Sequence, residues 1–153
     1  MINLQMLLRA IFRQPLYSPP PLGKKPIFSK LDETENSELR LPDVELDGYS
    51  LESGIVSNQK YPDTFHIPSP LQRNSLESSD IVKLHFKISR TRSLEDIEGE
   101  RMWVKSISRR GPYYIGELDN DPIARNEDNS PLKFGDQIIF LPEHVIAIYS
   151  EDE

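Results

Sequence analysis

The sequence predicts a mainly β domain, a β-rich α+β unit in which a small antiparallel five-stranded barrel or bent sheet carries one short helix. Three observations lead to this fold class. Apolar and polar residues alternate in short runs after residue 61, which is typical of half-buried strands. The connections between these runs are too short for crossover helices. A chain of 153 residues has the length of one domain.

Residues 1–60 are predicted to be an irregular N-terminal arm or linker ahead of the β-rich domain at residues 61–153. A short amphipathic helix is expected over residues 3–13, too short to span a membrane. A proline-rich segment follows, and the acidic stretch from residue 32 to residue 60 favours a linker, in which a strand around Val44 to Leu46 is an option. The apolar stripe of the helix is Leu4, Leu7, Leu8, Ile11 and Phe12.

The first elements of the domain follow from local patterns. Ser69 is an N-cap followed by a proline at the first helical position, which predicts a helix from Pro70 to about Leu76. The run "DIVKLHFKIS" alternates and predicts a strand. Its apolar face is Val82, Leu84, Phe86 and Ile88, and its polar face is Lys83, His85 and Lys87.

Four further strands complete the predicted sheet. After the charged connection "TRSLEDIEGE", the runs "RMWVKSIS" and "YYIGEL" flank "RRGP" and predict a β-hairpin with Gly111 in its turn. The runs "QIIFL" and "VIAIY" predict two more strands, separated only by "PEH". Brief turns between antiparallel strands favour a small barrel or a strongly bent sheet.

One pattern occurs twice in the domain. "LESSDIVKL" and "LKFGDQIIF" share the form L-x-x-[GS]-D-x-[IV]-x-[LF], with the aspartate at Asp80 and at Asp136. We interpret each copy as a turn followed by a strand, in which the aspartate carboxylate accepts a backbone N–H of the turn.

Composition and charge exclude several function classes. The chain has no cysteine, which removes disulfides, thiolate metal sites and cysteine nucleophiles and suits the reducing cytoplasm. The net charge is −7, and residues 1–31 hold five basic residues and no acid, so the rest is strongly acidic. An acidic body repels nucleic-acid backbones, so no nucleic-acid partner is expected. The acidity serves either solubility or a basic protein partner.

The stretch "GELDNDP", residues 116–122, raises the question of a metal or acid–base site. An EF-hand loop that begins at Asp119 fails at Ile123, Ala124 and Ser130. A strand ending with an acidic rim is the preferred interpretation, and no catalytic residue, metal or cofactor is expected. A looser divalent-metal site stays open, with Asp119, Asp121, Glu127 and Asp128 as its ligands.

The histidines and aromatic residues give weaker signals. None of the three histidines has the spacing of metal ligands, and His144, in a tight bend, is predicted to cap or pack. Trp103, Tyr113 and Tyr114 lie across the predicted hairpin, where they form either an aromatic binding platform or a packed cross-strand cluster. A local basic patch lies beside them, with Arg101, Lys105, Arg109 and Arg110.

A set of turn and strand-start residues runs through the last two-fifths of the chain. Its members are Met102, Trp103, Val104, Gly116, Leu118, Asn120, Pro122, Leu132, Gly135, Asp136, Ile138, Phe140, His144 and Val145. In this pattern the segment resembles a bacterial family of domains of unknown function that includes the YegJ-like proteins. The resemblance covers about the last ninety residues and implies structural roles at the glycines, Asn120, Pro122, Asp136 and His144, with no catalytic assignment.

These observations predict a non-enzymatic binding module with a protein partner. Its sharpest version is an immunity-type or inhibitory protein that masks a basic partner, which the family resemblance implies by analogy. The candidate binding residues are Trp103, Tyr113, Tyr114 and the four acids of the loop. Two alternatives stay open: a metal-dependent enzyme that uses Asp119 and Asp121, and a membrane- or organelle-associated protein led by its N-terminal helix.

Overall fold

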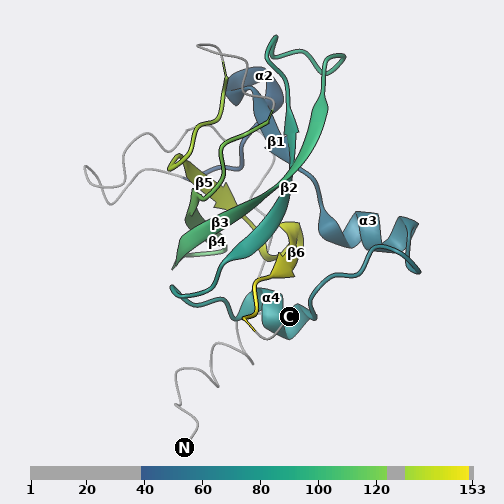
Figure 1. Ribbon diagram of the computed structural model, residues 1–153, viewed down its shortest axis with the longest axis vertical. Helices are drawn as coiled ribbons and strands as arrows, with labels where there is room; N and C mark the ends of the chain where they lie inside the picture. The colour runs from purple at the N-terminus through teal and green to yellow at the C-terminus, as the bar shows by residue number, and fades with distance from the viewer. Residues whose placement is uncertain (1–38, 124–129, 152–153) are drawn as a thin grey trace, which may run out of the picture.

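The computed structural model describes residues 39–123 and 130–151 of the chain (Figure 1). The helix predicted for residues 3–13 lies outside the described residues. The described chain is mainly β, as predicted. In chain order its elements are α2 (Val44–Asp47), β1 (Tyr49–Leu51), α3 (Gly54–Lys60), α4 (Pro70–Asn74), β2 (Val82–Ile88), β3 (Glu98–Arg110), β4 (Tyr113–Leu118), β5 (Gln137–Phe140), the 3-10 turn η2 (Pro142–His144) and β6 (Val145–Ile148).

The strands form one antiparallel sheet that curls into a half-barrel (Figure 1). The order is β1-β2-β3-β4-β5, and β6 pairs with β2 on the same side as β1. The two short strands therefore share one edge of β2: β1 lies opposite residues 86–88, and β6 lies opposite residues 82–84. β2 and β3 form the long central ladder, with seven paired positions.

The predicted boundary at residue 60 differs from the structure. Residues 39–60 belong to the folded body, because β1 pairs with β2 and Val44 at the start of α2 is buried. The strand suggested around Val44 to Leu46 is wrong: this segment is the helix α2, which Asp43 caps through its carboxylate. The described sheet thus has six strands rather than five, since the three residues of "YSL" are too few to carry a strand pattern that could be recognised.

The core lies on the concave face of the sheet. Along β2 the alternation predicted from the sequence is confirmed, with the four apolar side chains buried and the polar ones partly exposed. The same face takes alternate residues from β3, β4 and β5. The cluster consists of Leu76, Val82, Leu84, Phe86, Ile88, Met102, Val104, Ile107, Tyr114, Leu118, Leu132, Ile138, Phe140 and Val145.

A bulge in β3 changes which side chains face the core. Lys105 lies opposite Glu117 and Ser108 opposite Ile115, so β3 holds one residue more than β4 between these pairs. Ser106 takes the extra position with a φ of 54°. Because of this insertion Ile107, which strict alternation would place outside, joins the core.

The two copies of the repeated pattern form the same turn. Asp80 accepts the Glu77 N–H at 2.7 Å, and Asp136 accepts the Lys133 N–H at 2.8 Å. In each copy the aspartate N–H returns a hydrogen bond to the first carbonyl of the turn. The predicted α4 is also confirmed, with a capping box between Ser69 and Gln72.

Candidate binding face

The convex face of the sheet is divided into a covered half and an open half. On the covered half, over β4 and β5, a second apolar cluster holds Tyr113, Ile115, Ile139 and Leu141. Two leucines of the segment before α2, Leu39 and Leu41, pack against this cluster.

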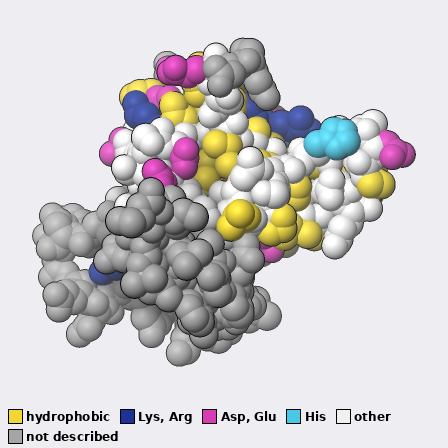
Figure 2. Space-filling view, turned by 90° about the horizontal axis from the view of Figure 1, so that it is seen from below, with side chains coloured by type: hydrophobic (Ala, Val, Ile, Leu, Met, Phe, Trp, Pro, Cys, Tyr) yellow, Lys and Arg dark blue, Asp and Glu magenta, His cyan; other side chains and the backbone are white. Residues whose placement is uncertain are grey.

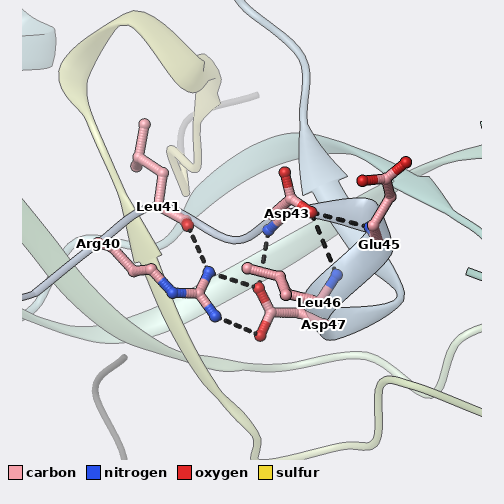
Figure 3. Close-up of polar contacts among 6 residues, drawn as sticks. All are labelled: Arg40, Leu41, Asp43, Glu45, Leu46 and Asp47. Carbon is pink, nitrogen blue, oxygen red and sulfur yellow. Dashed lines mark hydrogen bonds and ion pairs between the residues drawn. The ribbon is translucent and has the colours of Figure 1, made fainter. Parts of the chain in front are cut away.

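Arg40 holds this covering segment in place (Figure 3). Its guanidinium forms a bidentate pair with Asp47, with N–O distances of 2.7 and 2.9 Å, and donates to the Leu41 carbonyl at 2.9 Å. The Asp47 carboxylate also accepts the Asp43 N–H at 2.8 Å, so one carboxylate ties Arg40 to the start of α2. A bidentate guanidinium–carboxylate pair fixes orientation as well as distance, and the leucines beside Arg40 are held over β4 and β5.

We call the other half the open face and define it as the convex surface of β2 and β3. Its side chains alternate with those of the core and remain partly exposed. The register places Lys83 opposite Trp103 and His85 opposite Arg101. The open face consists of Lys83, His85, Lys87, Arg101, Trp103 and Lys105.

Trp103 lies at the centre of the open face. The Lys83 Nζ lies 4.5 Å from the centroid of the Trp103 ring, and the Tyr149 ring meets it edge-on at 6.1 Å. Two hydrogen bonds hold the backbone of Trp103. Its N–H donates to Asn120 Oδ1 at 2.6 Å, and its carbonyl accepts the Asp119 N–H at 2.8 Å. The indole is therefore presented by an anchored strand position rather than by a loop.

The cations of the open face differ in their partners. Lys87 lies 3.7 Å from Glu52, and Lys105 lies 3.0 Å from Asp119, so each has a carboxylate beside it. Within the part of the chain that the structure describes, Lys83 and Arg101 form no ion pair. Both lie over aromatic rings. Lys83 lies over Trp103, and the Arg101 guanidinium carbon is 5.2 Å from the Phe65 centroid.

His85 adds no positive charge to this face near neutral pH. Partial burial lowers its pKa from the ordinary value, and the nearby Arg101 and Lys87 lower it further, while Glu52 acts in the opposite direction. The Nδ1 atom of His85 lies 2.8 Å from Glu52. Among residues 39–123 and 130–151, Lys83 and Arg101 are accordingly the positions where the open face has positive charge without an ion-paired carboxylate.

The aromatic platform predicted from the hairpin is not formed. Tyr113 and Tyr114 are 6 % and 0 % exposed and point to opposite faces of β4, because neighbouring strand residues alternate. The Tyr114 hydroxyl accepts from the Leu76 N–H and from Arg109, and its ring stacks on Phe140. Of the three predicted aromatic residues, only Trp103 lies on an accessible surface.

The predicted acidic loop is only partly described. Asp119 pairs with Lys105, and Asp121 is exposed. Glu127 and Asp128 lie outside the described residues. Among residues 39–123 and 130–151, no group of three histidines or acids is placed to hold a metal ion.

The motif residues of the predicted strand ending have structural roles. Leu118 and Pro122 are buried, and Asn120 bridges to β3 through the Trp103 N–H. Gly116 lies where β4 crosses β3 so closely that a Cβ would clash with Val104. Gly135 has a φ of +86°, which a glycine adopts without strain in the turn before β5.

Lys83 and Tyr149 lie at this site, although the sequence pattern did not identify them as members of it. The polar face of β2 was the available signal for Lys83, but nothing local to Tyr149 links it to Trp103. Apolar side chains are also exposed on and next to α3 and α4, among them Val56, Tyr61 and Leu71. Figure 2 shows hydrophobic side chains across the centre of the described surface and a group of Lys and Arg side chains at its upper right.

None of the helices formed by the described residues has the length and hydropathy that a membrane span needs. Compared with known proteins, the chain matches no protein-family model, no curated protein and no solved structure. The resemblance to the family that includes the YegJ-like proteins therefore stays a prediction.

Proposed function

We propose that this chain is a non-enzymatic binding module that contacts a protein partner through the open face. The observation that carries the proposal is Trp103, an anchored and partly accessible indole that lies beside two cations with no ion pair among the described residues. Trp, Tyr and Arg are the residues that most often dominate the energy of protein interfaces. Here Trp103, Tyr149 and Arg101 occur on or beside one sheet face.

The described carboxylates and histidines support binding rather than catalysis. Asp80 and Asp136 close turns, Asp119 neutralises Lys105, and Asp47 holds Arg40. These acids already serve as partners of backbone or cationic groups. The metal-dependent enzyme stays a prediction, because two of its four proposed ligands lie outside the described residues.

A photo-crosslinking residue in place of Trp103 tests the proposal in native lysate. We expect a crosslinked product of defined mass from position 103, and none from the same residue placed at Leu94, which is exposed in the connection between β2 and β3. A product only at position 94, or none at position 103 under native conditions, would contradict a binding role for the open face.

The expectation of an immunity-type protein with a basic partner is a finer version of the same proposal. That version rests on the acidic charge of the chain after residue 31, on the lack of a recognisable catalytic motif in the sequence and on the family resemblance, whereas the open face contributes cations. Mass spectrometry of the crosslinked product separates the two cases, since it gives both the partner and the segment of it that lies on position 103.

A further inference from the structure

We infer that the open face recognises an extended acidic segment of a protein, with two carboxylates two residues apart and an apolar side chain next to them. This inference rests on the proposed binding role of the open face. It names the chemistry of the partner segment, which neither the sequence nor the comparisons indicate.

The charge of the face is the first argument. Four Lys and Arg side chains lie on the open face, but Glu52 and Asp119 accompany two of them. The remaining two, Lys83 and Arg101, have no carboxylate partner among the described residues. In a chain with a net charge of −7, two neighbouring cations without ion pairs are a local exception, and they are complementary to a short acidic segment rather than to a basic one.

Lys83 and Arg101 are also preorganised for a ligand. Lys83 lies over Trp103, and Arg101 lies over Phe65. Cation–π contacts restrict where the ammonium and guanidinium groups lie. A ligand carboxylate therefore meets side chains that are already oriented, which reduces the entropy that binding must overcome.

The spacing of the two cations sets the geometry of the ligand. Trp103 lies opposite Lys83, and Arg101 lies two residues before Trp103. Lys83 and Arg101 are therefore diagonal neighbours on one face of an antiparallel pair. Such neighbours are about 7–8 Å apart. Side chains two residues apart on an extended chain point to the same side and are about 7 Å apart, so an acid-x-acid segment matches both cations at once.

The aromatic rings supply the apolar part of the contact. Trp103 lies directly opposite Lys83 and two residues after Arg101 on the same strand, and the exposed Tyr149 meets it edge-on. Two rings at this angle leave an apolar surface beside the charged pair. An aliphatic or aromatic side chain two residues from one of the acids points to the same side of the extended segment and would cover it.

A polyanion fits this face less well than a short acidic segment. Nucleic acid binding typically engages about six to ten phosphates, each neutralised by a cation. The open face offers two cations without carboxylate partners, and Glu52 and Asp119 would lie close to further phosphates. The acidic protein segment is therefore the occupant that the charges favour.

The test is an NMR titration of the full chain, because Trp103 is its one tryptophan and its indole N–H reports on the centre of the face. The probes are a Glu-Leu-Glu peptide that carries a further leucine two residues before its first glutamate, on the same side of the extended chain as both glutamates, an isomer with adjacent glutamates, a Gln-Leu-Gln peptide, a Lys-Leu-Lys peptide and an oligothymidylate. We expect the Glu-Leu-Glu peptide to shift the indole signal at millimolar concentration or below, and to bind several-fold more tightly than its isomer.

Two matched double variants locate the effect. We expect Lys83→Glu with Arg101→Glu to weaken the Glu-Leu-Glu peptide by at least about tenfold, which corresponds to about 1.4 kcal/mol. Arg92→Glu with Arg110→Glu makes the same change in net charge, with Arg92 in the connection between β2 and β3 and Arg110 at the last position of β3, and it should change binding less than about twofold. Lys83→Arg with Arg101→Lys keeps both charges and should retain most of the binding.

Several outcomes would overturn the inference. These are an indole signal that does not move with any acidic peptide, equal binding of the Lys-Leu-Lys peptide, equal losses in both charge-reversal variants, or tighter binding of the oligothymidylate. The result is independent of the crosslinking test. A partner crosslinked at position 103 together with no response to acidic peptides would leave the binding role standing and remove the acidic segment.

Discussion

His144 has the structural role in the fold that its place in a tight bend predicts. It is 4 % exposed in η2, where its Nδ1 accepts the Leu141 N–H at 3.0 Å. Because burial disfavours the charged imidazolium, the pKa of His144 falls to about 4. The neutral ring closes the turn between β5 and β6, which agrees with the capping or packing role predicted for it.

The stability of the protein is expected to decrease as the pH falls from about 6.5 to about 4, because the unfolded chain takes up a proton at His144 that the folded chain refuses. At about pH 5 the loss from this group is about 2 kcal/mol relative to neutral pH. Urea denaturation at both pH values measures it. In His144→Asn, which keeps an acceptor but cannot titrate, the loss between the two pH values should be smaller by that amount, whereas His66→Asn at an exposed site should behave like the parent chain.

Gly116 is a second residue whose identity depends on a close contact. A Cβ at this position would meet the side chain of Val104 and lie 2.9 Å from the Lys105 carbonyl oxygen. We expect Gly116→Ala to lower the free energy of unfolding by about 2–3 kcal/mol, as overpacking typically does. The control is Gly111→Ala in the hairpin turn, where a Cβ meets no atom within 4 Å and only the positive φ is strained, at about 1 kcal/mol. Equal losses in the two variants would argue against the close crossing of β3 and β4.

At the scale of elements, the repeated turn shows which features are local. Each aspartate bonds a backbone N–H three residues earlier, and the leucine that opens each copy is buried in the core. The turn chemistry and the start of the strand lie within nine residues, so the sequence predicts them. Lys83 and Trp103 lie far apart in the sequence, so no pattern of this length predicts that they meet.

We expect Asp80→Ala and Asp136→Ala each to cost about 1 kcal/mol, because each change leaves a turn N–H without its carboxylate acceptor. Chemical denaturation of the two variants measures the loss. Asp63→Ala, which removes an exposed carboxylate that forms no side-chain hydrogen bond or ion pair with the described residues, is the matched control and should be neutral. A cost confined to one of the two turn variants would show that the two copies are not equivalent.

The prediction from the sequence is least accurate for residues 39–60, which precede the predicted domain boundary. Their polar and acidic composition indicated a linker, yet Asp43 caps α2 and Arg40 binds Asp47. Both contacts are made by charged side chains, so the residues that made the segment look unstructured are the ones that organise it. The pairing of β1 with residues 86–88 adds a tertiary contact that composition does not reveal.

For the whole molecule, the extent of the folded unit can be tested by truncation. A chain that starts at Leu39 should unfold cooperatively with a midpoint close to that of the full chain, since it keeps every described contact of the sheet. A chain that starts at Tyr61 loses α2, β1, α3 and the leucines over β4 and β5. We expect its thermal midpoint to fall by more than about 10 °C. Calorimetry decides between this and a domain that begins at residue 61, for which the two chains would have similar midpoints.

The local charge of the open face differs from the net charge of the whole chain. The chain is acidic overall, and the average alone favoured a basic partner. The fold places several cations on one half of one sheet face and pairs some of them with acids there. A partner contacts one face of the molecule. The arrangement of Lys83, Trp103 and Arg101 on the open face therefore predicts the chemistry of the partner better than the net charge does.

The sequence by itself determined the strand periodicity, the capped helix α4, the two aspartate turns and the role of Gly111 in the hairpin. These features depend on side-chain and backbone interactions within a few residues. The tertiary structure decided the rest: the bulge that turns Ile107 inward, the burial of Tyr113 and Tyr114, and the meeting of Lys83, Trp103 and Tyr149. These contacts join residues from different strands, and their register depends on packing across the whole sheet, which no local pattern of the sequence encodes.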